Sequence, residues 1–200
     1  MIKAFQNRVF VFAPGAGAPS NHPWMTAWSR KLGRLGSVMT IDYPYQLRGS
    51  RRPDPLPVLV AAHRAAVAKA RRDNRSQIVL AGKSMGGRVG CHVALEEEVS
   101  ALICFGYPLC GAGDRQKLRA DVLRKLSRPI LFIQGTRDPL CPLELLAEVR
   151  REMTTQSVLH IVEGADHSLI VSKARLKETG ETQEEVDARI FQEVERFLQN

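Results

Sequence analysis

Short apolar runs recur along the chain, and each is followed by a segment whose apolar residues have helical spacing. The runs are continuous in Val, Ile, Leu and Phe rather than alternating with polar residues, as in strands that are covered on both faces. We therefore predict six strands, at Arg8–Ala13, Ser37–Asp42, Gln77–Ala81, Ala101–Gly106, Ile130–Gln134 and Val158–Val162.

Amphipathic stripes predict helices after several of these strands. A proline begins two of the segments, which suits the first turn of a helix. The polar stretch from Asp166 to Thr182 has no such stripe, and we predict an exposed irregular loop there. The stripes are Trp24, Trp28 and Leu32 after Pro23; Leu143, Leu146 and Val149 after Pro142; and Val186, Ile190, Val194 and Phe197.

Six strands that alternate with helices predict an α/β fold. We expect a three-layer sandwich, with a mostly parallel six-stranded sheet and helices on both faces. Because the 200 residues show no internal repeat and no linker, we expect a single domain over residues 1–200. In such sheets functional groups gather beyond the carboxyl ends of the strands, so candidate residues are sought at the strand-to-helix junctions.

Residues 79–90 read VLAGKSMGGRVG and contain two competing motifs. Gly82-Lys83-Ser84 ends like a phosphate-binding P-loop, but that motif also requires a glycine where this chain has Gln77. The apolar run enters Gly82 directly, which leaves no loop whose N–H groups could surround a phosphate. We therefore reject the nucleotide-binding interpretation.

The same residues form G-x-S-x-G, the sharp strand-to-helix turn that exposes a nucleophilic serine. Small residues at Gly82 and Gly86 allow the strand and the helix to approach each other closely. Ser84 is then expected at a helix N-terminus, where the backbone N–H of Met85 can stabilise an oxyanion. Since glycine-rich turns also arise for structural reasons, the motif needs partners elsewhere in the chain.

A serine hydroxyl needs a base, and the base needs a carboxylate that orients it. Asp138 follows the fifth predicted strand and His167 follows the sixth. The chain order Ser84, Asp138, His167 is the order expected when all three lie at strand ends of such a sheet. The sequence thus predicts a catalytic triad. The alternatives are a turn aspartate and an exposed loop histidine, and the neighbouring Asp166 is expected to cap a turn.

These motifs resemble those of the α/β-hydrolase superfamily, in particular its small dienelactone-hydrolase-like branch. The resemblance implies a minimal α/β-hydrolase fold with no large cap. By position, it also makes the backbone N–H of Ala16 the second oxyanion donor. It rests on the Ser84 elbow together with Pro14-Gly15-Ala16-Gly17, Gly135-Thr136-Arg137-Asp138 and Gly164-Ala165-Asp166-His167-Ser168.

Within this branch the chain resembles a subgroup that includes a testis-expressed hydrolase-like protein and the hydrolase-like domain of a nonspecific-lethal complex subunit. The shared features include the Ser-Met-Gly elbow and Asn21-His22-Pro23 after the first glycine turn. The family commonly has His-Gly at that turn, whereas this chain has Pro14-Gly15. The difference puts the geometry of the oxyanion loop in question, but not the triad.

The sequence therefore predicts a serine hydrolase that acts on a small ester or related acyl substrate, with no cofactor and no metal. The alternative is a non-catalytic interaction module on the same fold. His22, Tyr107 and Arg48 are candidate substrate-binding residues. Arg48 lies in a loop that also carries Arg51 and Arg52, so a substrate bearing a carboxylate or phosphate is a hypothesis.

Composition adds little to this interpretation. The 44% hydrophobic and 25% charged content is typical of soluble globular proteins, and the net charge of +8 comes from scattered residues. We therefore expect a solvated surface and no nucleic-acid partner. No apolar run approaches the ~20 residues of a membrane helix, and nothing indicates export, so a cytoplasmic location is expected. The cysteines have no zinc-type spacing and are expected to be buried and reduced: Cys91, Cys104, Cys110 and Cys141.

Overall fold

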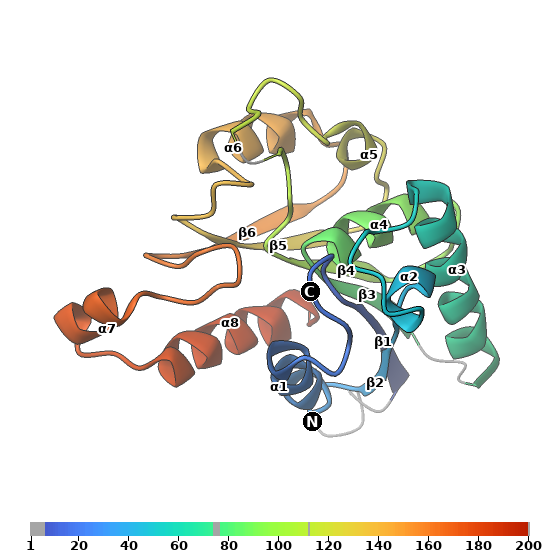
Figure 1. Cartoon of the computed structure of the whole chain (residues 1–200), viewed down its shortest axis with the longest axis horizontal. Coiled ribbons are helices and arrows are strands. Elements are labelled where there is room, and N and C mark those ends of the chain that lie inside the picture. The colour runs from blue at the N-terminus through green and yellow to red at the C-terminus, as the bar shows by residue number, and fades with distance from the viewer. Residues whose placement is uncertain (1–6, 74–76, 112, 200) are drawn as a thin grey trace.

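One parallel six-stranded sheet forms the centre of the computed structural model, which describes residues 7–73, 77–111 and 113–199 (Figure 1). Every neighbouring pair of strands is parallel, and the order across the sheet is β2-β1-β3-β4-β5-β6. All six predicted strands are present, with ends that differ from the prediction by at most two residues. They are β1 (Arg8–Ala13), β2 (Ser37–Thr40), β3 (Gln77–Lys83), β4 (Ala101–Phe105), β5 (Ile130–Gly135) and β6 (Ser157–Val162).

Helices cover both faces of the sheet, which confirms the predicted three-layer α/β architecture. Figure 1 shows α1 and α8 on one side of the sheet and α3 and α4 on the other. The short α7 has no buried residue. The helices are α1 (Pro23–Leu32), α2 (Pro44–Leu47), α3 (Leu56–Asp73), α4 (Met85–Val93), α5 (Asp121–Arg124), α6 (Leu143–Glu152), α7 (Lys173–Thr179) and α8 (Gln183–Phe197).

The continuous apolar strands divide their side chains between two cores. Along β1, Val9 and Val11 belong to the cluster under α3, α4, α5 and α6, whereas Phe10 and Phe12 belong to the cluster under α1 and α8. Successive residues of a strand point to opposite faces, so a strand buried on both faces must be apolar at every position. This requirement explains why the strands were recognisable as unbroken apolar runs.

The path of the chain locates the functional end of the sheet. From β1 the chain moves outward to the edge strand β2, returns past β1 to β3, and then continues in the opposite direction to β6. The strand order therefore reverses between β1 and β3. In open α/β sheets this reversal leaves a crevice beyond the carboxyl ends of the two strands, and ligands bind there. The glycine turn after β1 and the G-x-S-x-G turn after β3 both lie at this position.

The prediction of an irregular loop at Asp166–Thr182 was wrong, although most of this stretch is exposed or half-exposed as predicted. Leu169 and Val171 are buried in the core, and α7 occupies residues 173–179. The side chain of Ser172 caps α7 by accepting a hydrogen bond from the Arg175 N–H, and Gly180 ends the helix at φ 70°. An exposed helix of two turns has no apolar stripe, so its pattern cannot be distinguished from that of a loop.

Two further expectations concern the cysteines and the membrane. All four cysteines carry free thiols and are buried, as predicted. None of the helices within the described ranges combines the length and the apolar composition needed to cross a membrane.

The packing of Trp28 between α1 and the sheet gives a test of the fold. Trp28 is almost fully buried, and its ring centroid lies 4.8 Å from that of Phe105 on β4. We expect Trp28→Ala to lower the free energy of unfolding by about 3–5 kcal/mol in urea denaturation, because it removes a large side chain from a close-packed core. Leu47→Ala is the control, since Leu47 is 75% exposed. Equal losses in the two variants would contradict this packing.

Candidate active site

Ser84 occupies a strained turn between β3 and α4. Its backbone has φ 50° and ψ −116°, in the left-handed half of conformational space that non-glycine residues rarely adopt. Such a conformation costs of order 1–3 kcal/mol and persists only where the surroundings impose it. The Ser84 N–H donates to the carbonyl of Phe105 at 2.9 Å, which fixes the turn to the adjacent strand β4.

Two glycines make the turn possible by removing side chains from a close contact. A Cβ on Gly82 would lie 2.2 Å from the backbone N of Gly87, and a Cβ on Gly86 would lie 2.4 Å from the carbonyl oxygen of Ala13. The first turn of α4 therefore packs against β3 and against the end of β1 at a distance that only glycine permits. This close packing presents Ser84 at the carboxyl edge of the sheet.

The structure brings Ser84, His167 and Asp138 into one hydrogen-bonded chain. His167 Nε2 lies 2.7 Å from Ser84 Oγ, and His167 Nδ1 lies 2.7 Å from Asp138 Oδ2. The Asp138 side chain is fully buried, whereas the His167 side chain is 23% exposed. The three side chains come from the ends of β3, β5 and β6. Among the described residues, no group of three or more His, Cys, Asp or Glu side chains is arranged to hold a metal ion.

Gln134 supports the buried carboxylate and was not predicted from the sequence. Its Nε2 donates to Asp138 Oδ2 at 3.1 Å, and its Oε1 accepts a hydrogen bond from the Tyr107 N–H. The other carboxylate oxygen of Asp138 accepts from the Leu140 N–H at 2.8 Å. Gln134 is fully buried near the end of an otherwise apolar strand. That isolated polar position was the signal in the sequence, because buried polar groups are retained only with hydrogen-bond partners.

The loop that carries His167 packs tightly against the ends of β4 and β5. A Cβ on Gly106, whose φ is 66°, would lie 2.5 Å from the His167 carbonyl oxygen. A Cβ on Gly135 would lie 2.2 Å from the carbonyl oxygen of Ala165. Asp166 caps the turn as expected, since its Oδ1 accepts hydrogen bonds from the N–H groups of Ser168 and Ile170 at 2.7 and 3.0 Å.

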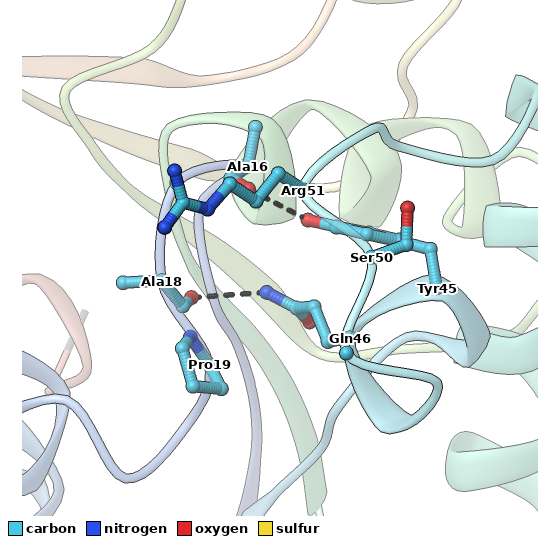
Figure 2. A pocket seen from close by; sticks show the side chains of 9 residues that line it. Ala16, Ala18, Pro19, Tyr45, Gln46, Ser50 and Arg51 are labelled. Atoms are coloured by element: carbon cyan, nitrogen blue, oxygen red, sulfur yellow. Dashed lines mark hydrogen bonds between the residues drawn. The ribbon is translucent and has the colours of Figure 1, made fainter.

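Side chains from α2 hold the loop after β1, which contains the predicted oxyanion donor Ala16. The Tyr45 hydroxyl donates to the Ala16 carbonyl at 3.0 Å. Gln46 Nε2 donates to the Gly15 carbonyl at 3.2 Å and to the Ala18 carbonyl at 2.9 Å (Figure 2). Burial, together with the nearby carboxylates of Asp54 and Asp42, raises the pKa of Tyr45 to about 12, so this donor stays protonated at neutral pH. The loop that follows Pro14 is thus held by two side chains of α2.

The loop also passes directly over the serine. A Cβ on Gly15 would lie 3.5 Å from Ser84 Cβ. The hydrogen bonds within the described ranges leave the backbone N–H groups of Ala16 and Met85 without an acceptor. Both groups belong to segments that flank Ser84, one in the loop after β1 and one at the start of α4. Their role as a pair of oxyanion donors stays a prediction.

A cavity of about 390 Å³ adjoins this loop. It lies between the segment after β1 and the segment around α2, and Figure 2 shows Arg51 extending toward its Ala16 side. Of the described residues that line the cavity, Arg51 alone has a cationic side chain. The lining residues are Ala16, Gly17, Ala18, Pro19, Tyr45, Gln46, Gly49, Ser50 and Arg51.

None of the three residues predicted to bind substrate lines this cavity. The binding role predicted for Tyr107 is wrong for its side chain, because the ring is fully buried and the hydroxyl donates to the Arg119 carbonyl at 2.8 Å. His22 caps α1 by accepting a hydrogen bond from the Trp24 N–H at 3.2 Å. Arg48 forms an ion pair with Asp54 at 2.6 Å and lies at the surface. For His22 and Arg48, a role in binding stays a prediction.

The chain matches the alpha/beta hydrolase domain family over residues 6–199. A serine hydrolase homologue from Coxiella burnetii aligns over 90% of this chain and 84% of its own, with 20% identity and a TM-score of 0.71. A serine hydrolase without a lid, from Xanthomonas campestris, aligns over 82% of this chain and 74% of its own, with 19% identity and a TM-score of 0.67. A dienelactone hydrolase from Anabaena variabilis aligns over 84% of this chain and 80% of its own, with 20% identity and a TM-score of 0.62.

The buried hydrogen bonds of Gln134 give a test of the site's construction. We expect Gln134→Leu to lower the free energy of unfolding by about 1–3 kcal/mol, because it leaves the Tyr107 N–H unpaired in the protein interior. The measurement is urea denaturation, with Gln156→Leu as the control at an exposed position, where the change is expected within about 0.5 kcal/mol. A Gln134→Leu protein as stable as the control would contradict the supporting role of Gln134.

Proposed function

We propose that this chain, which belongs to the alpha/beta hydrolase domain family, is a serine hydrolase that acts on a small ester or related acyl substrate. The observation that carries the proposal is the continuous hydrogen bonding from Ser84 through His167 to Asp138. A hydroxyl, an imidazole and a buried carboxylate in this order form the constellation that activates a serine for acyl transfer.

From this geometry we infer a role for each group in a two-step reaction. Ser84 Oγ attacks the carbonyl carbon of the substrate while His167 Nε2 accepts the hydroxyl proton. The N–H groups of Ala16 and Met85 bind the negative oxygen of the tetrahedral intermediate. His167 then gives the proton to the leaving alcohol. In the second step, water attacks the acyl-enzyme with His167 as base, and the acid is released.

Asp138 acts through the histidine. Its carboxylate accepts the hydrogen bond from His167 Nδ1, which leaves Nε2 free to accept the serine proton and stabilises the imidazolium that forms. Gln134 and the Leu140 N–H hold the carboxylate in the orientation that this hydrogen bond needs. The buried side of the site thus sets the tautomer of the base.

The surroundings of the site favour a small substrate that enters from solvent. The α/β-hydrolase fold here has no large cap, since α5, of four residues, is the one helix among the described residues that connect β4 and β5. Structural neighbours include a dienelactone hydrolase and a hydrolase without a lid. Resemblance to the subgroup of the testis-expressed protein and the nonspecific-lethal complex subunit remains a prediction, and so does the alternative of a non-catalytic interaction module.

Replacement of the nucleophile tests the proposal. We expect Ser84→Ala to abolish labelling by a fluorophosphonate probe and to reduce kcat/KM for short-chain p-nitrophenyl esters by about 10⁴-fold or more. Ser127→Ala is the matched control, because Ser127 is exposed just before the amino end of β5, at the opposite edge of the sheet. Equal labelling of Ser84→Ala and wild type would contradict the assignment. A wild type that is neither labelled nor active would favour the interaction module.

The cavity beside the oxyanion loop suggests the chemistry of the substrate. Arg48 of the same loop region is already paired with Asp54, whereas no ion pair of Arg51 is present among the described residues. Arg51 therefore offers its charge to the cavity that Ala16 borders. We propose that the cavity receives a part of the substrate that carries a carboxylate, which a guanidinium can bind through two parallel hydrogen bonds.

Substitution of Arg51 tests this substrate class. We expect Arg51→Gln to lower kcat/KM about tenfold for mono-p-nitrophenyl succinate, because this ester carries a carboxylate that Arg51 can bind. The kcat/KM for p-nitrophenyl butyrate, which has no charged group, should change by less than about twofold. High salt should reduce the preference in the wild type in the same direction. Arg52→Gln serves as the control for net charge. If Arg51→Gln changed both esters equally, or neither, the anionic substrate would be abandoned.

A further inference from the structure

The side chain of Lys83 is half-buried and turns toward the loop that carries His167. Lys83 is the variable residue of G-x-S-x-G, directly before Ser84. Its Nζ donates a hydrogen bond to the backbone carbonyl of His167 at 2.7 Å, and it lies 5.4 Å from the ring centroid of Trp24. The ammonium thus links the end of β3, directly before Ser84, to the backbone of His167.

Trp24 makes a second connection to the same loop. Its Nε1 donates to the carbonyl of Ser168 at 2.9 Å, so the carbonyls of two successive loop residues are bound by side chains from β3 and α1. The Trp24 ring packs edge-on against Phe105, with 5.6 Å between the centroids. The Trp24 donor is therefore anchored against the core of the fold.

The loop needs such connections because its own conformation is unusual. Leu169, two residues after His167, has φ 62°, which is unfavourable for a side chain with a Cβ. The imidazole must satisfy two hydrogen bonds at once, at 2.7 Å to Ser84 and 2.7 Å to Asp138. A shift of about 1 Å in a reacting group can cost of order 100-fold in rate. A rigid backbone at His167 is thus a requirement of the mechanism.

We propose that Lys83 is a positioning residue, which holds the backbone of His167 so that the imidazole stays between Ser84 and Asp138. The proposal rests on the proposed serine hydrolase function. Lys83 does not contact the reacting atoms and acts only through the histidine loop. The variable position of the elbow motif then has a defined task in this chain.

Burial of the Lys83 ammonium destabilises the folded protein. The positioning role can therefore be distinguished from a structural one, because a lysine that served stability would not carry this cost. Burial lowers the pKa of Lys83 to about 8, and the carboxylates of Asp138 and Asp166 partly oppose the shift. Among the described residues, these two carboxylates are the charged groups that act on the ammonium, which also contacts the Trp24 ring and the His167 carbonyl. Because the pKa is below its unfolded value, the unfolded chain binds more protons between pH 8 and 10.5, and stability rises with pH there.

The same pKa predicts a pH dependence of activity with the opposite sign. Below about pH 8 the ammonium makes a charge-assisted hydrogen bond to the His167 carbonyl. Above that pH the neutral amine is a weaker donor, and the loop is held less firmly. The wild-type enzyme should therefore lose part of its kcat as pH rises through about 8, while its stability against unfolding increases.

The decisive experiment compares Lys83→Met and Lys83→Arg with wild type. The measurements are kcat and KM for p-nitrophenyl butyrate from pH 6 to 10, the thermal unfolding midpoint, and hydrogen exchange of the amides of residues 166–171. We expect Lys83→Met to lower kcat about 10- to 100-fold with KM within threefold, to unfold at the same or a higher temperature, and to exchange faster in this loop. Lys83→Arg, which keeps a charged donor, should recover kcat and lose the change near pH 8.

Controls and failures are distinguishable. Lys69→Met, at an exposed position of α3, should leave all three measurements unchanged. A Lys83→Met enzyme with wild-type kcat and loop exchange would overturn the proposal, as would a loss of kcat that follows a lowered unfolding temperature. If wild type itself proved inactive, the hydrolase function would fail. Hydrogen exchange in Lys83→Met would still decide whether Lys83 holds the loop.

Discussion

The contact between β3, α4 and the end of β1 is the constraint on which the site depends. Gly82 and Gly86 allow backbone atoms to meet where any Cβ would collide, and this contact forces Ser84 into a left-handed conformation. The half-buried serine is held at the carboxyl edge of the sheet because its neighbours are packed so tightly. The same contact brings the loop after β1 over the serine, and with it the N–H of Ala16. A sequence without glycine at either position could keep the sheet but could not keep this turn.

Hydrogen bonds from outside the triad then determine where each part of the site lies. Gln134 holds the carboxylate, Tyr45 and Gln46 hold the loop after β1, and Lys83 with Trp24 holds the loop that carries His167. In each case a side chain donates a hydrogen bond to a carboxylate or a carbonyl oxygen. The hydrogen bond restricts the motion of a segment that carries a functional group. Precise placement of a few groups by a surrounding set of hydrogen bonds is the general requirement for catalysis by preorganisation.

The sequence indicated the fold and the triad for a physical reason. Strands buried on both faces have to be apolar throughout, and functional residues follow them directly, so Ser84, Asp138 and His167 could be recognised by type, order and position. The supporting contacts could not be recognised, because Lys83 meets His167 across 84 residues and Gln46 meets Gly15 across 31. Tyr107 follows a strand as the triad residues do, yet it turns into the core. Position at a strand end does not determine the direction of a side chain.

The central claim is that Ser84 forms a covalent intermediate with an acyl group. The most direct measurement is mass spectrometry of the protein quenched during turnover of p-nitrophenyl acetate, with the modified residue located by peptide sequencing. The account predicts a single acetyl group on Ser84, which accumulates before steady state and disappears when the substrate is exhausted. Turnover without an acetylated Ser84, or acetylation confined to a neighbouring residue such as Lys83, would contradict it.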